Sequence, residues 1–497
     1  MSDELTPEQA AHLGQLIDAH PEARELGERF EAAGHELYLV GGSVRDTLLA
    51  RVEDDLLGID LDFATSARPE VTEELVQPWA DAIWLTGARF GTVSAEKGRG
   101  EHTPPRRVEI TTFRSDAYEA HSRHPEVTYG DTIEGDLHRR DFTVNAMAVR
   151  VPEFTFVDLF GGLRDLNARV LRTPADPHES FGDDPLRMVR LARFAAVLGA
   201  IPDEATLAAA TQMAEALSSI SRERIRDELW KLVAAPDPTR GIDLLVTTGL
   251  AEHSLPELID LHTCVDPIHR HKDVYAHTLA VVENAMELEP DGPDPVLRMA
   301  ALLHDIGKPE TREIHPDGTV TFHHHEVVGA RLTRHRMREL KFDKQTTKDV
   351  SELVRLHLRF HTYRMGWTDS AVRRYVRDAG HLLDRLNRLT RADVTTRNER
   401  KAQAIQQRMD ELEVRIEQLR EQEELESLRP PIDGNAIMSH LGLRPGPLVG
   451  EAWNHLLERR IDEGPMDVPA ALEELESWWR AKRAGLSQDE IEQALRS

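Results

Sequence analysis

The chain has 497 residues and a formal net charge of −27, which is enough for roughly three or four folding units with their own cores. Its one cysteine, Cys264, excludes an intramolecular disulfide and suits a reducing compartment. No run of about eighteen apolar residues is present to span a membrane, and the acidic start of the chain lacks the apolar core of a signal peptide. We therefore expect a cytoplasmic protein that does not span a membrane.

A glycine turn follows the first predicted strand. Leu37–Val40 is a short apolar run typical of a buried strand, and Gly41 and Gly42 permit a tight turn whose backbone can approach a phosphate. Ser43 and Arg45 add polar and cationic groups, and a helical pattern follows them. Such a turn is one of the parts that phosphoryl transfer needs.

Paired carboxylates follow in the next predicted strand. Polar and apolar residues alternate over Ile59–Phe63, and residues two apart on a strand face the same way, so Asp60 and Asp62 should point into one pocket. Like charges so close together need a cation between them, as Mg²⁺ provides in nucleotidyl-transfer sites. The alternative is a chance match, because the chain has 88 acidic residues. Asp54 and Asp55 make a poorer pair, since adjacent acids on a strand face opposite ways.

With the glycine turn at this spacing, the chain resembles the nucleotidyltransferase superfamily of DNA polymerase beta. It resembles more closely the tRNA CCA-adding enzymes and bacterial poly(A) polymerases. Arg139–Ala146 resembles the second motif of that family, which implies that Arg140 lies near the nucleotide. Ser221–Leu229 is a further match. Glu109 is a candidate third carboxylate, for which the alternative is an edge-strand side chain that faces solvent.

Asp183–Phe194 resembles the helix with which this family selects its nucleotide. The resemblance places Asp184 and Arg187 at the positions that hydrogen-bond the base edge. A carboxylate only accepts hydrogen bonds and a guanidinium only donates them, so the pair can read a base. Arginines recur at every third position and could bind a triphosphate, for which the alternative is a solvated charged face. The predicted nucleotide-binding residues are Gly42, Ser43, Arg45, Arg140, Asp184, Arg187, Arg190 and Arg193.

A separate metal signature lies in the second half of the chain. His304 and Asp305 end an apolar helical stretch, and together with His277 and Asp393 they resemble the HD phosphohydrolase pattern, which implies one divalent ion bound by two histidines and two aspartates. Imidazole and carboxylate ligands suit Mn, Co, Ni, Fe or Zn, and the pattern does not choose among these metals. Two further histidines stand where binuclear members of that family add ligands; the alternatives for them are a polar loop and a partly buried helix position. They are His325 and His357.

The resemblance implies an α+β fold, in which a small mixed α/β nucleotidyltransferase head precedes an all-α neck, an HD domain and a helical tail. We expect the head over 20–165 and the neck, with the nucleotide-selecting motif, over 166–255. The HD domain should occupy 256–398 and the tail 399–497.

Local patterns add detail to this division. A glycine and two prolines in 99–107 predict a loop between two strands of the head. Apolar residues over 405–419 recur at heptad spacing, which predicts a long helix packed on its own body in preference to an intermolecular coiled coil, although dimerisation stays open. Residues 443–447 resemble the RNA-contacting tail of the family.

The resemblance implies a tRNA nucleotidyltransferase that adds C, C and A to the tRNA 3′ end from CTP and ATP, with Mg²⁺ in the head. The HD domain could in addition hydrolyse phosphate esters. The alternative enzyme is a poly(A) polymerase, because both enzymes carry these motifs. The alternative of another class is an RNA-binding module in which only the HD domain is catalytic, and the intact head motifs argue against it.

A net charge of −27 does not favour RNA binding, which normally rests on Lys and Arg that neutralise phosphates. We therefore expect local basic surfaces. The arginine-rich stretches are 187–193, 222–226 and 355–374.

Overall fold

The computed structural model divides the chain into two compact units, Met1–Pro256 and Glu257–Ser497. The predicted division into four domains is finer than these units and stays a prediction. Asp60, the first predicted magnesium ligand, lies outside the residues that the structure describes. The described residues are 4–49, 61–85, 91–98, 105–114, 129–264, 274–317, 319–362, 367–396, 398–422, 429–487, 490–491 and 494–495.

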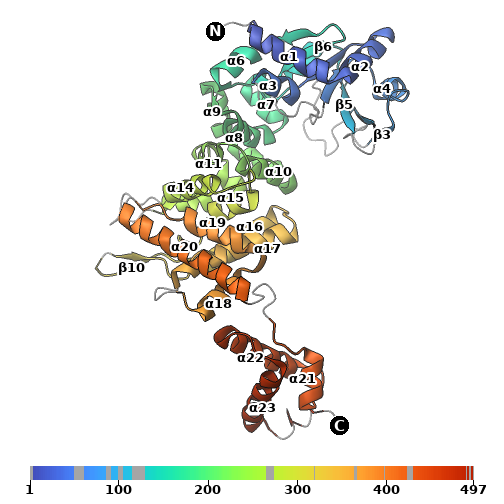
Figure 1. Ribbon diagram of the computed structural model, residues 1–497. Helices are drawn as coiled ribbons and strands as arrows, with labels where there is room; N and C mark the ends of the chain where they lie inside the picture. Colours follow the sequence, from blue (N-terminus) through green and yellow to red (C-terminus); the bar gives the residue numbers. More distant parts are fainter. Residues whose placement is uncertain are drawn as a thin grey trace. The chain divides into compact units, whose positions relative to one another are not determined.

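A mixed seven-stranded sheet forms the centre of the predicted head (Figure 1). Its strands are β1 (Leu37–Val40), β2 (Leu61–Thr65), β3 (Ala82–Trp84), β4 (Thr92–Lys97), β5 (Arg106–Thr112), β6 (Met147–Val151) and β7 (Thr155–Asp158). Their order across the sheet is β3-β4-β5-β2-β1-β6-β7. β2 and β5 run parallel, and every other neighbouring pair is antiparallel. The loop predicted over 99–107 falls between β4 and β5; its residues 99–104 lie outside the described residues, and Arg106 and Arg107 belong to β5.

Helices cover the sheet of the head. A capping box between Thr6 and Gln9 starts α1 (Pro7–Ala19), which packs on α3 (Gly42–Leu48). α2 (Pro21–Ala32) packs on β1 and β6, and α4 (Pro69–Val76) packs on β4 and β5. The buried side chains on one side of the sheet include Tyr38, Val40, Ala64 and Phe113, which form one apolar cluster. Two short helices, α5 (Ile133–His138) and α6 (Gly162–Ala168), flank the second motif.

The rest of the first unit is mainly helical, as predicted. α8 (Leu186–Leu198) packs against both α10 (Arg222–Val233) and α11 (Pro238–Thr247). Gly241 permits the close approach of α11, because a Cβ there would lie 2.5 Å from the carbonyl oxygen of Ala192. The other elements are α7 (Pro177–Asp183), α9 (Glu204–Gln212), α12 (Ala251–Ser254) and the paired two-residue strands β8 (Val170–Leu171) and β9 (Ile201–Pro202).

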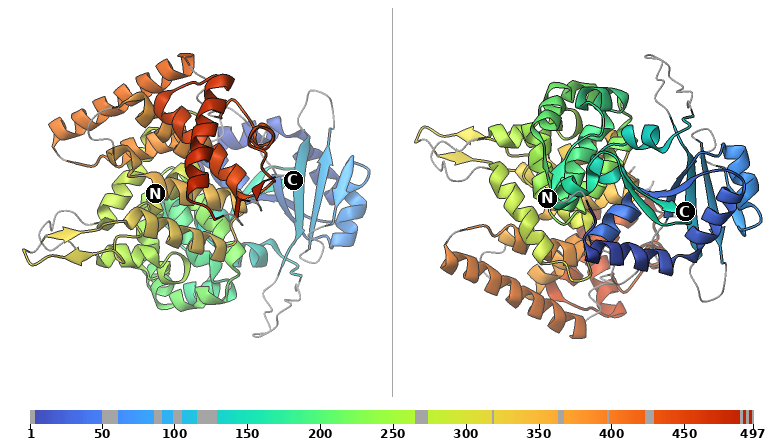
Figure 2. Two further views of the ribbon diagram at one scale, coloured as in Figure 1. Left: turned by 90° about the horizontal axis from the view of Figure 1, so that it is seen from below. Right: turned by 90° about the horizontal axis from the view of Figure 1, so that it is seen from above.

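The second unit begins with a helical body. One hairpin, not predicted from the sequence, projects from it (Figure 2). Its strands are β10 (Glu313–Ile314) and β11 (Val320–Thr321). The helices are α13 (Glu257–Thr263), α14 (Val274–Glu287), α15 (Pro295–Leu303), α16 (His325–Glu339), α17 (Lys344–Leu356), α18 (Asp369–Ala379), α19 (Leu383–Ala392) and α20 (Glu399–Gln422).

The long helix α20 packs on its own unit. Its heptad residues Met409, Leu412, Ile416 and Leu419 are buried, and α20 contacts α18 and α19. The preferred interpretation of the heptad pattern is therefore confirmed.

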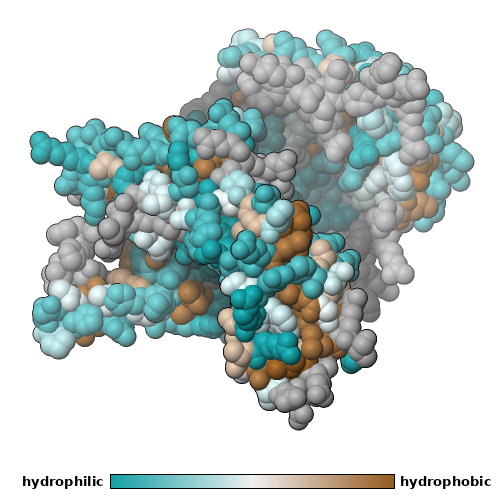
Figure 3. Space-filling model, turned by 60° about the horizontal axis from the view of Figure 1, so that its bottom comes forward, coloured by the Kyte–Doolittle hydropathy of each residue, from teal (hydrophilic) through white to brown (hydrophobic). Residues whose placement is uncertain are grey.

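Three further helices close the chain around an apolar cluster of their own: α21 (Gly434–Leu441), α22 (Pro447–Glu463) and α23 (Val468–Ala484). Arg374 and Arg377 of α18 donate to Glu458 of α22 at 2.9 and 2.7 Å. Buried Arg373 donates to the carbonyl oxygen of Ile461 at 3.1 Å. The face drawn in Figure 3 is mostly hydrophilic, in keeping with the charged composition. Among the described residues, no helix combines the length and the apolar character needed to cross a membrane.

Candidate functional site

The predicted glycine turn connects β1 to α3. Gly41 precedes α3 with a φ of +79°, a conformation that only glycine adopts without strain. A Cβ at this position would lie 3.5 Å from Nη1 of Arg140 and 3.9 Å from Oδ2 of Asp62. The structure thus brings the turn, one predicted magnesium ligand and the predicted nucleotide-binding arginine of the second motif together.

Asp62 lies on the exposed face of β2. Its neighbours Leu61 and Phe63 are buried while Asp62 is exposed, as the alternating pattern predicts. In the parallel register of β2 and β5, Asp62 is paired with Glu109, which is also exposed. Paired residues on neighbouring strands project from the same face of a sheet. The third carboxylate candidate therefore stands beside Asp62.

Arg140 is anchored to a buried carboxylate. Its Nε and Nη2 donate to Oδ2 of Asp136 at 3.3 and 3.0 Å. Burial by itself would raise the pKa of Asp136, but the charges of Arg140 and Arg139 outweigh it and lower that pKa. Asp136 is therefore ionised at neutral pH and holds Arg140 beside the turn.

Ser43 and Arg45 are engaged inside the head. The Ser43 hydroxyl donates to the carbonyl oxygen of Val40 at 3.2 Å. Arg45 is buried and donates to the carboxylate of its neighbour Asp46 and, at 2.5 Å, to Oδ1 of Asn145. Both side chains brace the turn from inside, and their contact with a nucleotide stays a prediction.

Arg190 and Arg193 do not form the free cationic strip that their spacing suggested. Arg190 donates to Asp141 and lies 3.6 Å from Glu228, and Arg193 donates to Glu228 at 2.5 Å. Burial would raise the pKa of Asp141, but the charge of Arg190 and hydrogen bonds from Asn145 and Arg190 lower it. The solvated-face alternative does not describe them either, since both guanidinium groups are partly buried. Their contact with a triphosphate stays a prediction.

Asp184 and Arg187 lie at the junction of α7 and α8. Arg187 donates to the hydroxyl of Ser180 at 2.8 Å and to the carbonyl oxygen of Arg139 at 2.6 Å. Oδ2 of Asp184 accepts a hydrogen bond from Arg224 of α10 at 2.7 Å. The predicted base-reading pair is thus held by partners from several segments.

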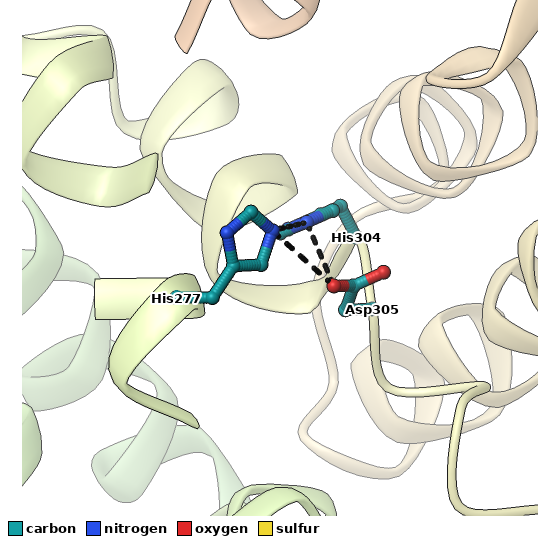
Figure 4. A group of neighbouring side chains, drawn as sticks. All are labelled: His277, His304 and Asp305. Atoms are coloured by element: carbon teal, nitrogen blue, oxygen red, sulfur yellow. Dashed lines mark hydrogen bonds and ion pairs between the residues drawn. The ribbon is translucent and has the colours of Figure 1, made fainter. Parts of the chain in front are cut away.

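A cluster of histidine and aspartate side chains occupies the second unit (Figure 4). Nε2 of His277, from α14, lies 3.3 Å from Nε2 of His304, which follows α15. Oδ2 of Asp305 lies 3.5 and 3.2 Å from these two nitrogens. Oδ1 of Asp393, at the end of α19, lies 3.1 Å from Nε2 of His277. The four predicted HD ligands converge.

The two additional histidines join the same cluster. Nε2 of His325 lies 3.3 Å from Oδ1 of Asp305 and 3.3 Å from Nε2 of His357. The carboxylate of Asp305 therefore turns one oxygen toward His277 and His304 and the other toward His325. This arrangement makes two overlapping groups that could each hold a metal ion.

Backbone contacts orient the imidazoles. Nδ1 of His304, His325 and His357 each lies 2.7 Å from the carbonyl oxygen three residues earlier in the chain. A carbonyl oxygen only accepts, so each Nδ1 carries a hydrogen, and in the neutral imidazole each Nε2 presents its lone pair to the cluster. Nδ1 of His277 lies 2.8 Å from the hydroxyl of Thr395. The set has the donors of a transition-metal site.

The electrostatics of the cluster suit a cation. Burial would raise the pKa of Asp305, but His304 and Lys308 lower it well below its usual value. Burial, with the charge of His304, lowers the pKa of His357 to about 3. His357 is therefore neutral at physiological pH, as a metal ligand must be. Lys308, whose ammonium contacts Asp305, was not singled out from the sequence, although it stands one helical turn beyond that aspartate.

Comparison with known proteins identifies the family of the chain. The chain matches the poly A polymerase head domain over residues 37–172, the probable RNA- and SrmB-binding site of polymerase A over 201–261, and the HD domain over 274–413. It is 34% identical over 429 residues to an A-adding tRNA nucleotidyltransferase of Deinococcus radiodurans, a match that covers 85% of this chain and 91% of the relative. The chain belongs to the tRNA nucleotidyltransferase and poly(A) polymerase family.

Other members of this family match over shorter stretches. A CCA-adding enzyme of Levilactobacillus brevis is 39% identical over 283 residues, which cover 55% of this chain and 67% of that enzyme. The fold resembles that of the Bacillus stearothermophilus CCA-adding enzyme in complex with CTP, with a TM-score of 0.65, 23% identity and coverage of 94% of this chain and 99% of that one. The predicted family and the α+β fold class of this nucleotidyltransferase are confirmed.

The geometry at the turn predicts the effect of one methyl group. Gly41→Ala should lower nucleotide addition by at least about tenfold, because the added Cβ would fill space at van der Waals distance from Arg140 and Asp62, where the phosphates and the metal ion of the predicted site must approach, and displacing reacting groups is costly. Gly34→Ala is the matched control, since Gly34 has a φ of +78° but nothing within 4 Å of the added Cβ. Both variants should lose similar stability from strain, measured as the melting temperature. Equal addition by the two variants would contradict a role for the open space beside Gly41.

Proposed function

We propose that this nucleotidyltransferase adds C, C and A to the 3′ end of tRNA, using CTP and ATP, in the cytoplasm. The observation that carries the proposal is the meeting of Gly41, Asp62 and Arg140 where the central strand β1 ends and its neighbour β2 begins. A curated relative of the chain is named CCA-adding enzyme. Solved structures of CCA-adding enzymes, among them a complex with tRNA, have a similar fold.

A second candidate is addition of the terminal A alone. It is favoured by the Deinococcus radiodurans relative, an A-adding enzyme, because that match covers far more of this chain than the match to the Levilactobacillus brevis enzyme. Poly(A) addition is the third activity that the head motifs allow.

The three activities differ in which ends they extend. With CTP alone, a CCA-adding enzyme extends tRNA that lacks its terminus by two nucleotides, whereas an A-adding enzyme extends it by none. With ATP alone, the A-adding enzyme extends only tRNA that already ends in CC, and a poly(A) polymerase adds a long tract to unrelated RNA. On sequencing gels we expect CTP alone to extend the truncated tRNA by two nucleotides. Absence of CTP incorporation would overturn CCA addition, and incorporation of any nucleotide would remove the binding-module alternative.

In this proposal Asp60 and Asp62 hold Mg²⁺, with Glu109 beside them. The described donors fit this ion, because Asp62 and Glu109 present hard carboxylate oxygens on one exposed face. Bound there, Mg²⁺ would polarise the α-phosphate and activate the attacking 3′ hydroxyl. The turn at Gly41 offers backbone close to the phosphates, and Arg140 offers a cation on the other side of the turn. Asp184 and Arg187 read the base.

Removal of a magnesium ligand should separate chemistry from binding. Asp62→Asn or Asp60→Asn should lower nucleotide addition on the order of a hundredfold or more and leave tRNA affinity in gel shifts nearly unchanged, since RNA contacts rest on other groups. Glu70→Gln, which changes an exposed carboxylate of α4, is the matched control. Addition at the control level by either Asn variant would refute the assignment.

We further propose that the HD cluster holds two divalent transition-metal ions and hydrolyses phosphate esters. The first ion is held by His277, His304, Asp305 and Asp393. The second is held by the other oxygen of Asp305 with His325 and His357. Support comes from the two oxygens of Asp305, which face different histidine pairs.

Metal content tests this assignment directly. By elemental analysis after equilibration with Mn²⁺, His325→Ala or His357→Ala should bind one ion fewer than the wild-type chain, and Asp305→Asn should bind two fewer. His335→Ala, on the exposed side of α16, is the matched control. Nucleotide addition should stay near normal in all of them, because the two centres lie in separate folded units. Unchanged metal content in His357→Ala would rule out the second ion.

A further inference from the structure

One buried residue of α7 contacts both members of the predicted base-reading pair. The carbonyl oxygen of Ser180 accepts hydrogen bonds from the backbone N–H of Asp184 at 3.3 Å and from Nη1 of Arg187 at 3.1 Å. The hydroxyl oxygen of Ser180 accepts a further hydrogen bond from the same Nη1 at 2.8 Å. Ser180 has no exposed surface, so these contacts are shielded from water.

Arg187 is fixed by uncharged oxygens. Its other terminal nitrogen, Nη2, donates to the carbonyl oxygen of Arg139 at 2.6 Å, so that acceptors from two segments set the plane of the guanidinium. Within the described residues, no carboxylate lies at ion-pair distance from Arg187, in contrast to Arg190 and Arg193. The charge of Arg187 is therefore positioned but not neutralised by a partner carboxylate.

The hydroxyl of Ser180 is not needed for the helix itself. A buried serine in a helix commonly donates to the carbonyl four residues earlier, as Ser254 does to Leu250 at 2.9 Å. The carbonyl oxygen of Ser180, and not its hydroxyl, accepts the hydrogen bond from the N–H of Asp184 that ends α7. Alanine is also a better helix former than serine. What the hydroxyl adds is the contact with Arg187.

We propose that Ser180 is a positioning residue for nucleotide selection, whose hydroxyl sets the plane of the Arg187 guanidinium against the base. The proposal rests on the base-reading role proposed for Asp184 and Arg187. Discrimination between bases depends on donors and acceptors held in fixed directions, because a guanidinium that can rotate also satisfies the wrong base.

Ser180→Ala removes the hydroxyl and keeps the carbonyl. We expect the preference for CTP and ATP over UTP and GTP, measured as the ratio of kcat/KM values on truncated tRNA, to fall roughly tenfold, the effect of about 1.4 kcal/mol from one hydrogen bond to a charged group. Ser254→Ala is the control for loss of a buried hydroxyl and should keep the wild-type preference. Ser180→Cys keeps the size of the side chain but offers only a weak acceptor, and it should show the same loss if Ser180→Ala does not fold.

A double-mutant cycle separates positioning from packing. Once Arg187 is changed to alanine, Ser180→Ala should cause no further loss of preference, because its effect acts through Arg187. Additive losses, or a lower melting temperature with unchanged preference, would overturn the role of Ser180. If Arg187→Ala blurs selection and neither Ser180→Ala nor Ser180→Cys does, the proposal for Ser180 alone fails. If Arg187→Ala leaves selection unchanged, the base-reading role fails and the role of Ser180 fails with it.

Discussion

The buried carboxylate of Asp141 is the interaction on which the first unit depends. It accepts hydrogen bonds from the N–H of Phe142, from Asn145 and from Arg190, and Asn145 in turn accepts from Arg45. A buried charge without partners would cost several kcal/mol, so these segments are held together as a set. The result is that α3, which follows the glycine turn, and α8, which carries Arg187, are fixed to the same second motif. The turn proposed to bind phosphates and the arginine proposed to read the base are therefore connected through one motif.

The parts of this site that were predictable from the sequence are those in which cause and effect lie within a few residues. Alternation around Asp62 predicted that this carboxylate faces away from its apolar neighbours, and the consecutive glycines predicted a tight turn, in which Gly41 has a positive φ. What could not be predicted are partners that are distant in the chain. The spacing of Arg190 and Arg193 is compatible with a strip for triphosphate, but Asp141 and Glu228 stand 49 and 35 residues away. No local sequence pattern indicates which distant carboxylate pairs with which arginine.

The HD cluster was predictable for a different reason. His304 and His357 directly follow the helices α15 and α17, and His325 is the first residue of α16. In each of them Nδ1 lies near the carbonyl oxygen three residues earlier, so contacts within three residues fix the direction of Nε2. Ligand identity followed from the resemblance, and orientation follows from local geometry. The role of Thr395 could not be predicted, because its contact with His277 spans 118 residues. The division of the Asp305 oxygens between two histidine pairs likewise needs the packing of several helices.

Internal pairing also changes what the arginine clusters imply for RNA binding. Arg374 and Arg377 fasten α22 to α18, and Arg193 pairs with Glu228. An arginine matched by a carboxylate contributes little net potential to a surface, so counting arginines overstates the attraction of these stretches for phosphates. Arg187 differs, because its partners are hydroxyl and carbonyl oxygens. Neutral acceptors fix its direction, and none of the described carboxylates pairs with its positive charge, which is the combination that the proposed base-reading role requires.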